Sequence, residues 1–343
     1  MNHLSLSEWR QVVLHQLGLS RPLELHEIVQ GHNGIQAQFQ PYADFGFKSR
    51  LHASDYQSDW QKPLVRQWSL RGTVHAYLKE EIPLYLHQDR RYFRTQETDH
   101  WVKKGVSPQL IDHYQALILD ALEDGPKSRQ DLKAILNKAS GPSSQHDRLT
   151  SAWGGIFAVM VGQGLIYQLY GQRVFARLDH YQPWDRPSAE HEIARRYFSN
   201  FGPVSLADAR YYFKQNKSVI EAWMADLPLQ AIKVADQTRF VINHFDLSDL
   251  APVPTCLQLA GFDALLLGFE KTANPFFDPS YIRQLYTMTG IVKPVFLIHG
   301  IVRATWRNDK GKVLLKGLGD LSTNEKSLID HYFKEQGQPY AFE

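Results

Sequence analysis

The feature that most constrains the fold is an order of elements that occurs twice in the chain. In residues 107–185, caps and apolar periodicity predict three helices and then a β-hairpin whose strands, IYQLY and RVFARL, are joined at Gly171 and Gln172. Residues 186–250 repeat this order and end in a hairpin across ADQT. Three helices followed by a hairpin are typical of a winged helix, so the sequence predicts tandem winged-helix domains.

Most helices of this chain are expected to begin with the same signal. A serine followed three residues later by a carboxylate forms a capping box, in which each side chain binds the other's backbone amide. We predict five helix starts from this pattern, at Ser5 with Glu8, Ser128 with Asp131, Ser205 with Asp208, Ser218 with Glu221, and Ser322 with Glu325. The last of these predicts a terminal helix.

The composition changes beyond Pro252 and Pro254. Glycines punctuate four apolar runs, FDALLLGF, VFLIHG, IVRATW and KVLLKGL, which predict strands. We therefore expect an α+β protein in which tandem winged helices precede a β-rich, barrel-like element, an open barrel or a sandwich, that is closed by a helix. The expected divisions are residues 1–106, 107–185, 186–250 and 251–343.

Composition excludes several classes of protein. The 343 residues are 43% hydrophobic and 22% charged, which is typical of a folded chain. The net charge of +2 permits a nucleic-acid partner without requiring one. A single cysteine and histidines without ligand spacing predict no disulfide, metal or other cofactor. No apolar stretch approaches a membrane span, so we expect a cytoplasmic protein.

The stretch GIQAQF places two uncharged amides, Gln36 and Gln38, two residues apart. Side chains alternate along an extended segment, so both amides point to one side and Ala37 points to the other. Such a pair suits binding of a water molecule or a sugar oxygen. Taken alone, the stretch favours two solvated residues on an edge strand or a loop, because glutamine side chains are mostly exposed.

Several other side chains are candidates for a functional site. His75 is interpreted as a structural histidine or a ligand, and Asp263 either caps a turn or stabilises positive charge in a site. Near the turn at His299 and Gly300, a hairpin is either a plain barrel hairpin or a probe of a DNA groove. The candidate DNA-contacting residues are Arg71, Arg90, Arg91, Arg94, Lys127, Arg129, Arg173, His299 and Arg303. Each basic residue alone also suits a solvated face, but on a tandem winged-helix frame they favour phosphate binding.

Five separated motifs resemble a known family. They are GIQAQ, the pattern R-x-W-x-x-RGTVH at residues 66–75, FGPVSLADARYYF, GFDALLLGF and HGIVRATW, in this order. Together they resemble the AlkZ/YcaQ family of winged-helix DNA glycosylases, in its Gln-x-Gln branch. The resemblance implies winged helices, including a winged-helix-like region 1–106, and a β-barrel element around a concave DNA-binding channel. It also implies that Gln36 and Gln38 are the catalytic pair.

The resemblance implies a monofunctional DNA glycosylase of base excision repair, acting as a monomer on double-stranded DNA. Alkylated, cationic purines such as N7-alkylguanine and N3-alkyladenine are its expected substrates, with bulky adducts and interstrand crosslinks left open. Asp263 and His75 are expected to support the glutamines, and neither a membrane nor a protein partner is expected. The alternative is a non-catalytic winged-helix regulator, which would usually bind a repeated site as a symmetric dimer.

Overall fold

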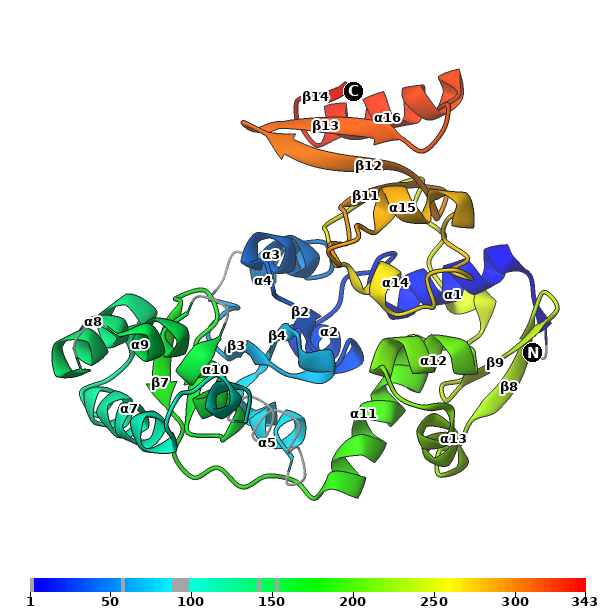
Figure 1. Cartoon of the computed structure of the whole chain (residues 1–343). Helices are drawn as coiled ribbons and strands as arrows, with labels where there is room; N and C mark the ends of the chain where they lie inside the picture. Colours follow the sequence, from blue (N-terminus) through cyan, green and yellow to red (C-terminus); the bar gives the residue numbers. More distant parts are fainter. Residues whose placement is uncertain (1–2, 57–58, 88–98, 141–142, 152–153) are drawn as a thin grey trace. The chain divides into compact units, whose positions relative to one another are not determined.

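The computed structural model describes residues 3–56, 59–87, 99–140, 143–151 and 154–343 (Figure 1). The chain forms two compact units, one made of residues 1–58 and 191–343 and the other of residues 59–190. The fold is of the expected mixed α+β class. The finer division into four regions stays a prediction.

The N-terminal part of the first unit is mainly helical. Its elements are β1 (His3–Leu4), α1 (Leu6–Gln16), α2 (Leu25–Gly31), β2 (Ile35–Gln36), α3 (Gln40–Lys48) and α4 (Ala53–Tyr56). The predicted capping box begins α1: Glu8 accepts from the Ser5 amide at 2.7 Å, and Ser5 accepts from the Glu8 amide at 3.2 Å. Trp9 on α1 is fully buried and donates from Nε1 to the carbonyl of Pro203 at 2.7 Å.

The second predicted set of three helices and a hairpin is present along the chain. It comprises α11 (Arg186–Asn200), α12 (Leu206–Phe213), α13 (Lys217–Ala225), β8 (Gln230–Val234) and β9 (Gln237–Val241). Strand β1 adds to β8 in parallel. One cap was predicted wrongly, because Asn216 rather than Ser218 precedes α13, and Ser218 lies inside the helix.

The C-terminal strands form an open five-stranded sheet of order β10-β11-β12-β13-β14 in the described residues, so the β-barrel element that the resemblance implies is not closed. Its edge strands, β10 and β14, each pair with one neighbour, and α16 packs against apolar side chains of the sheet (Figure 1). The elements are β10 (Cys256–Leu259), α14 (Ala264–Leu267), α15 (Ile282–Leu285), β11 (Val295–Ile298), β12 (Ile301–Asp309), β13 (Lys312–Gly317), α16 (Thr323–Glu335) and β14 (Tyr340–Phe342).

The run FDALLLGF is a short helix rather than a strand. Asp263 is the N-cap of α14, and its side chain accepts a hydrogen bond from the amide of Leu265 at 2.9 Å. A short apolar run fits a buried strand and a buried helical turn equally well, so periodicity cannot separate them. The carboxylate at the start of the run favours the helix.

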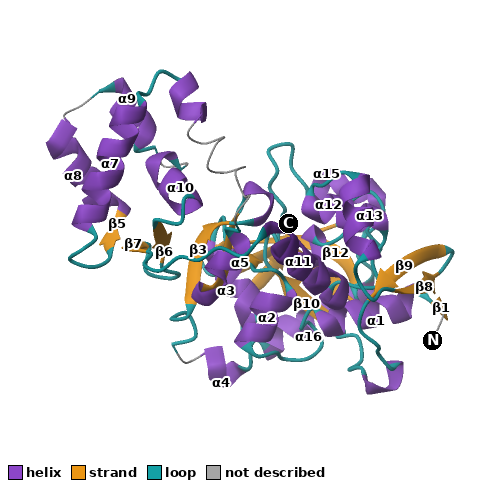
Figure 2. Ribbon diagram, turned by 90° about the horizontal axis from the view of Figure 1, so that it is seen from below, coloured by secondary structure: helices purple, strands orange, loops and turns teal. Residues whose placement is uncertain are grey.

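The second unit contains the first predicted set of helices. Its elements are β3 (Leu64–Trp68), β4 (Val74–Leu78), α5 (Ile82–Tyr85), α7 (Pro108–Ala121), β5 (Lys127–Ser128), α8 (Arg129–Ser140), α9 (Ser144–Leu149), α10 (Gly155–Gly162), β6 (Ile166–Gln168) and β7 (Val174–Arg177). Strands β5, β7 and β6 form a small sheet (Figure 2). The expected third helix is divided into α9 and α10, because Gly155 has φ +57° and a Cβ there would lie 2.0 Å from the Leu149 carbonyl oxygen.

None of the helices in the described ranges is long and apolar enough to cross a membrane.

Candidate active site and DNA-contacting residues

The two glutamines lie between α2 and α3 in the first unit. The turn after α2 ends at Gly34, which has φ +84° and donates from its amide to the Val29 carbonyl at 2.8 Å. Burial alternates along the next residues: Ala37 is fully buried, whereas Gln36 and Gln38 are half-buried. The segment therefore anchors itself through Ala37 and leaves both amides partly accessible. Amide oxygens and N–H groups so placed can orient a water molecule.

A buried ion pair stabilises α3, the helix that follows the glutamines. Arg50, just beyond α3, forms a bidentate pair with Asp263 at 2.9 and 3.0 Å, and both side chains are 1% exposed. The guanidinium also donates to the carbonyls of Leu17 and Gly46 at 2.8 and 3.0 Å. The pair therefore joins α1, α3 and the cap of α14.

Asp263 thus makes the capping contact that was one of its two interpretations, and its charge is balanced by Arg50. A supporting role for this carboxylate in catalysis stays a prediction. Sequence reasoning missed Arg50, because an arginine that is destined for burial carries no local signal that distinguishes it from a solvated one.

His32 lies near this ion pair, and the charges of Arg50 and Asp263 both affect its pKa. Its Nδ1 lies 2.6 Å from the carbonyl of Ile28, so Nδ1 carries the proton and donates. Burial lowers the pKa of His32 to about 3, and the positive charge of Arg50 contributes to this shift. The imidazole is therefore neutral at physiological pH.

His75 lies in the second unit, on β4, and is almost fully buried. Its Nε2 lies 3.2 Å from the guanidinium of Arg71, a group that only donates, so Nε2 accepts. The proton is then on Nδ1, which lies 2.8 Å from the Ser69 hydroxyl oxygen and 3.2 Å from the Thr73 carbonyl oxygen. These contacts place His75 within the β3–β4 hairpin as a hydrogen-bonded side chain. Arg71 itself has φ +58° and is half-buried.

Three arginines from different elements gather in the second unit. Burial lowers the pKa of Arg66 on β3, and the neighbouring charge of Arg173 lowers it further. Burial likewise lowers the pKa of Arg129, with a contribution from Arg66. Arg129 donates to the Ser151 carbonyl at 2.8 Å and lies 4.5 Å from the ring centre of Phe157. Cations whose charges disfavour one another are stabilised by an anion, so this cluster is a candidate for contact with a phosphate.

This arginine cluster, Arg66, Arg129 and Arg173, includes two predicted DNA contacts and one residue, Arg66, that was not among them. Lys127 lies beside Arg129 in the chain, on β5, where it pairs with Phe175 of β7. The sequence could have indicated Arg66 as a candidate, because it alternates with buried residues on β3. The sequence could not have indicated that Arg66 lies near the other two arginines.

The remaining predicted contacts are dispersed. His299 has φ +48° and is exposed in the turn between β11 and β12. Arg303 donates to Glu325 at 2.5 Å and this contact, with the capping bonds to Ser322, lowers the pKa of Glu325 to about 2. Arg303 therefore supports the start of α16 in the free protein. Arg90, Arg91 and Arg94 lie outside the described residues.

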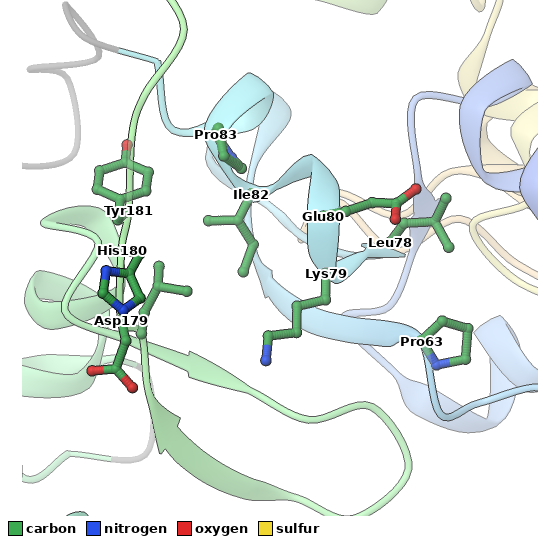
Figure 3. Close-up of a pocket in the computed structure, with 10 residues that line it drawn as sticks. Pro63, Leu78, Lys79, Glu80, Ile82, Pro83, Asp179, His180 and Tyr181 are labelled. Atoms are coloured by element: carbon green, nitrogen blue, oxygen red, sulfur yellow. The ribbon is translucent and has the colours of Figure 1, made fainter.

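A pocket of about 370 Å³ opens in the second unit, lined by the end of β4 and the chain after β7 (Figure 3). Lys79 at its wall donates to the hydroxyl of Tyr167 at 2.8 Å. None of the predicted site residues lines this pocket. Among the described residues, no group of three or more histidine, cysteine or acidic side chains could hold a metal ion.

Comparisons with known proteins agree with this arrangement of motifs. A family model described as DNA glycosylase AlkZ-like matches residues 29–331. No curated protein sequence matches the chain. Among solved structures, the DNA glycosylase AlkZ of Streptomyces sahachiroi is similar, with a TM-score of 0.76 and 19% identity over 99% of this chain and 100% of that one.

Proposed function

Because the chain belongs to the DNA glycosylase AlkZ-like family, we propose that it hydrolyses the N-glycosidic bond of cationic alkylated purines in DNA, with Gln36 and Gln38 as its catalytic pair. The observation that carries this proposal is the segment itself, in which two half-buried amides flank a fully buried Ala37. The family membership makes the protein a DNA glycosylase. Its substrates and its catalytic residues are our proposal.

The chemistry of the substrate explains why neutral amides suffice. Cleavage of an N-glycosidic bond passes through an oxocarbenium-like sugar. A neutral purine leaves poorly without a general acid, whereas N7-alkylguanine and N3-alkyladenine already carry a positive charge and leave as neutral bases. The two glutamines then orient a water molecule below C1′ and direct their oxygen dipoles at the developing sugar cation.

The absence of a carboxylate in this pair also provides selectivity. A carboxylate general base typically contributes about 10²- to 10⁴-fold to a rate. An amide contributes less, so undamaged bases remain uncleaved while cationic ones are released. His75 and Asp263 are proposed supporting residues.

Binding of the duplex is proposed to rest on the arginine cluster and on the other candidate DNA-contacting residues named from the sequence, in a tandem winged-helix frame that forms a concave channel. Phosphate contacts of this kind position DNA without reading its sequence. We propose that the protein acts as a monomer on nucleoid DNA in the cytoplasm, with bulky adducts and interstrand crosslinks as further candidate substrates.

Base release from a duplex with a single N7-methylguanine tests this proposal. Wild type is compared with the Gln36→Ala, Gln38→Ala double variant, and abasic product is resolved by alkaline cleavage. Gln40→Ala, a nearby amide on α3 outside the pair, is the matched control. We expect release by wild type and the control, and background release by the double variant.

Equal release by the double variant would remove Gln36 and Gln38 from catalysis. If wild type binds DNA but releases no base from methylated, bulky-adduct or crosslinked duplexes, the protein is instead a DNA-binding module.

A further inference from the structure

An exposed aromatic ring follows the glutamine pair directly. Phe39 precedes α3, comes one residue after Gln38, and is 44% exposed, although it is a large apolar side chain. Its ring stacks on that of Phe262, with centroids 5.6 Å apart and planes inclined by 22°. Tyr42 on α3 completes the group, with its ring 5.9 Å from that of Phe39. We call these three side chains the aromatic platform.

The structure holds Phe262 in place at a conformational cost. Phe262 is 7% exposed and has φ +61°, a region that bulky residues rarely adopt. The next residue, Asp263, is fixed by the bidentate pair with Arg50 and by the amide of Leu265. On the other side, a Cβ on Gly261 would lie 2.7 Å from the Tyr42 ring, so the turn packs tightly against the platform.

Phe262 therefore serves as a rigid support beneath Phe39, whose remaining surface is exposed beside the glutamines. Aromatic rings attract cations that lie over their faces, and they also stack on nucleobases. A purine alkylated at N7 or N3 combines both properties, because it is a flat ring with a positive charge. A neutral purine is also a flat ring that can stack, but it carries no positive charge.

We infer that Phe39 is a specificity-determining residue, which stacks on the cationic base and distinguishes it from undamaged purines. The inference rests on the proposed function, since it places the lesion at Gln38. In this arrangement Phe39 recognises the positive charge on the base, whereas the neutral glutamines orient the water molecule.

The test measures binding rather than catalysis. The probe is a duplex with a 2′-fluoro-N7-methylguanosine, because the fluorine disfavours the sugar cation and keeps the lesion intact. Its dissociation constant is compared with that of the same duplex carrying 2′-fluoroguanosine. The variants are Phe39→Leu, which keeps apolar bulk without a π face, and Phe39→Trp, which keeps the face. Phe342→Leu, at a phenylalanine that is 40% exposed on β14, is the matched control.

We expect wild type, Phe39→Trp and Phe342→Leu to prefer the cationic duplex by about tenfold, and Phe39→Leu to lose this preference. A wild-type preference retained in Phe39→Leu would overturn the inference and would favour an apolar wedge between base pairs, a task that leucine performs as well. No preference in wild type would overturn it also. Failure of the proposed function is seen separately, as no base release from the ordinary N7-methylguanine duplex.

Discussion

At the scale of single residues, the helix that follows the glutamine pair is held by a buried ion pair. Arg50 and Asp263 are 213 residues apart in sequence yet form a bidentate pair that water does not reach. His32 remains neutral nearby because burial and the Arg50 charge both oppose its protonation. Arg50 also donates to the Gly46 carbonyl in α3, so the ion pair helps to fix α3 and the segment that precedes it.

Replacing Asp263 with alanine should destabilise the protein strongly. The substitution leaves the Arg50 guanidinium buried without its counter-ion and removes the cap of α14, at a cost of about 3–5 kcal/mol in the free energy of unfolding. Urea unfolding measures this cost. The exposed pair between Arg307 and Glu343 is the control, and Arg307→Gln should change stability by less than about 1 kcal/mol. A loss below 1 kcal/mol for Asp263→Ala would show that the buried pair is dispensable.

His32 should make the fold sensitive to acid. Its pKa is about 3 in the folded protein and about 6.5 when unfolded, so the unfolded chain binds the extra proton between these values. Stability therefore rises with pH through this window, and at pH 5 it is lower than at pH 7 by about 2 kcal/mol from this residue. Urea unfolding of His32→Phe between pH 5 and 7 should show a smaller pH dependence than wild type. An unchanged slope would assign the acid sensitivity to other groups.

At the scale of elements, the capping signals were the most dependable predictions, because a capping box is completed within four consecutive residues. Ser5, Ser205 and Ser322 each form the predicted box. The apolar run after Asp263 was assigned wrongly because its length suits both a strand and a helical turn. The sequence left an open barrel and a sandwich as alternatives, since the arrangement depends on whether the edge strands meet, and apolar runs alone do not determine that.

Arg303 forms an ion pair at the start of α16 and is also a candidate DNA contact. Its contact with Glu325 lies at the first turn of α16 and is partly exposed, so Arg303→Gln should cost less than about 1 kcal/mol of stability. If Arg303 also contacts DNA, the same variant should weaken binding to an undamaged duplex by severalfold in a fluorescence anisotropy titration. Lys326→Gln, an exposed lysine on the same helix, serves as the control. Affinity equal to that of wild type would confine Arg303 to its structural role.

At the scale of the whole molecule, DNA affinity must come from local clusters, because the net charge is only +2. Polyelectrolyte binding depends on how many phosphates are neutralised, and this number determines how steeply affinity falls with salt. The arginine cluster provides three cations from separate elements of one compact unit. Arg173, at the end of the turn before β7, is the exposed member.

Arg173→Gln should reduce the salt dependence of DNA binding. Loss of one phosphate contact lowers the slope of log affinity against log salt by about 1. The slope is measured by anisotropy between low and moderate salt, and Lys138→Gln on α8 is a control in the same unit that the proposal does not assign to DNA. A slope equal to that of wild type would exclude Arg173 from phosphate contact.

The sequence by itself determined the features that depend on near neighbours along the chain. Helix starts, the two hairpins and the alternation around Ala37 all arise from residues a few positions apart, where local sterics and capping bonds decide the outcome. Only the tertiary structure decided that Arg50 neutralises Asp263, that Arg66 joins Arg129 and Arg173, and that Phe262 supports Phe39. These contacts join distant segments, and their free energy depends on burial and geometry, which exist only once the chain has packed.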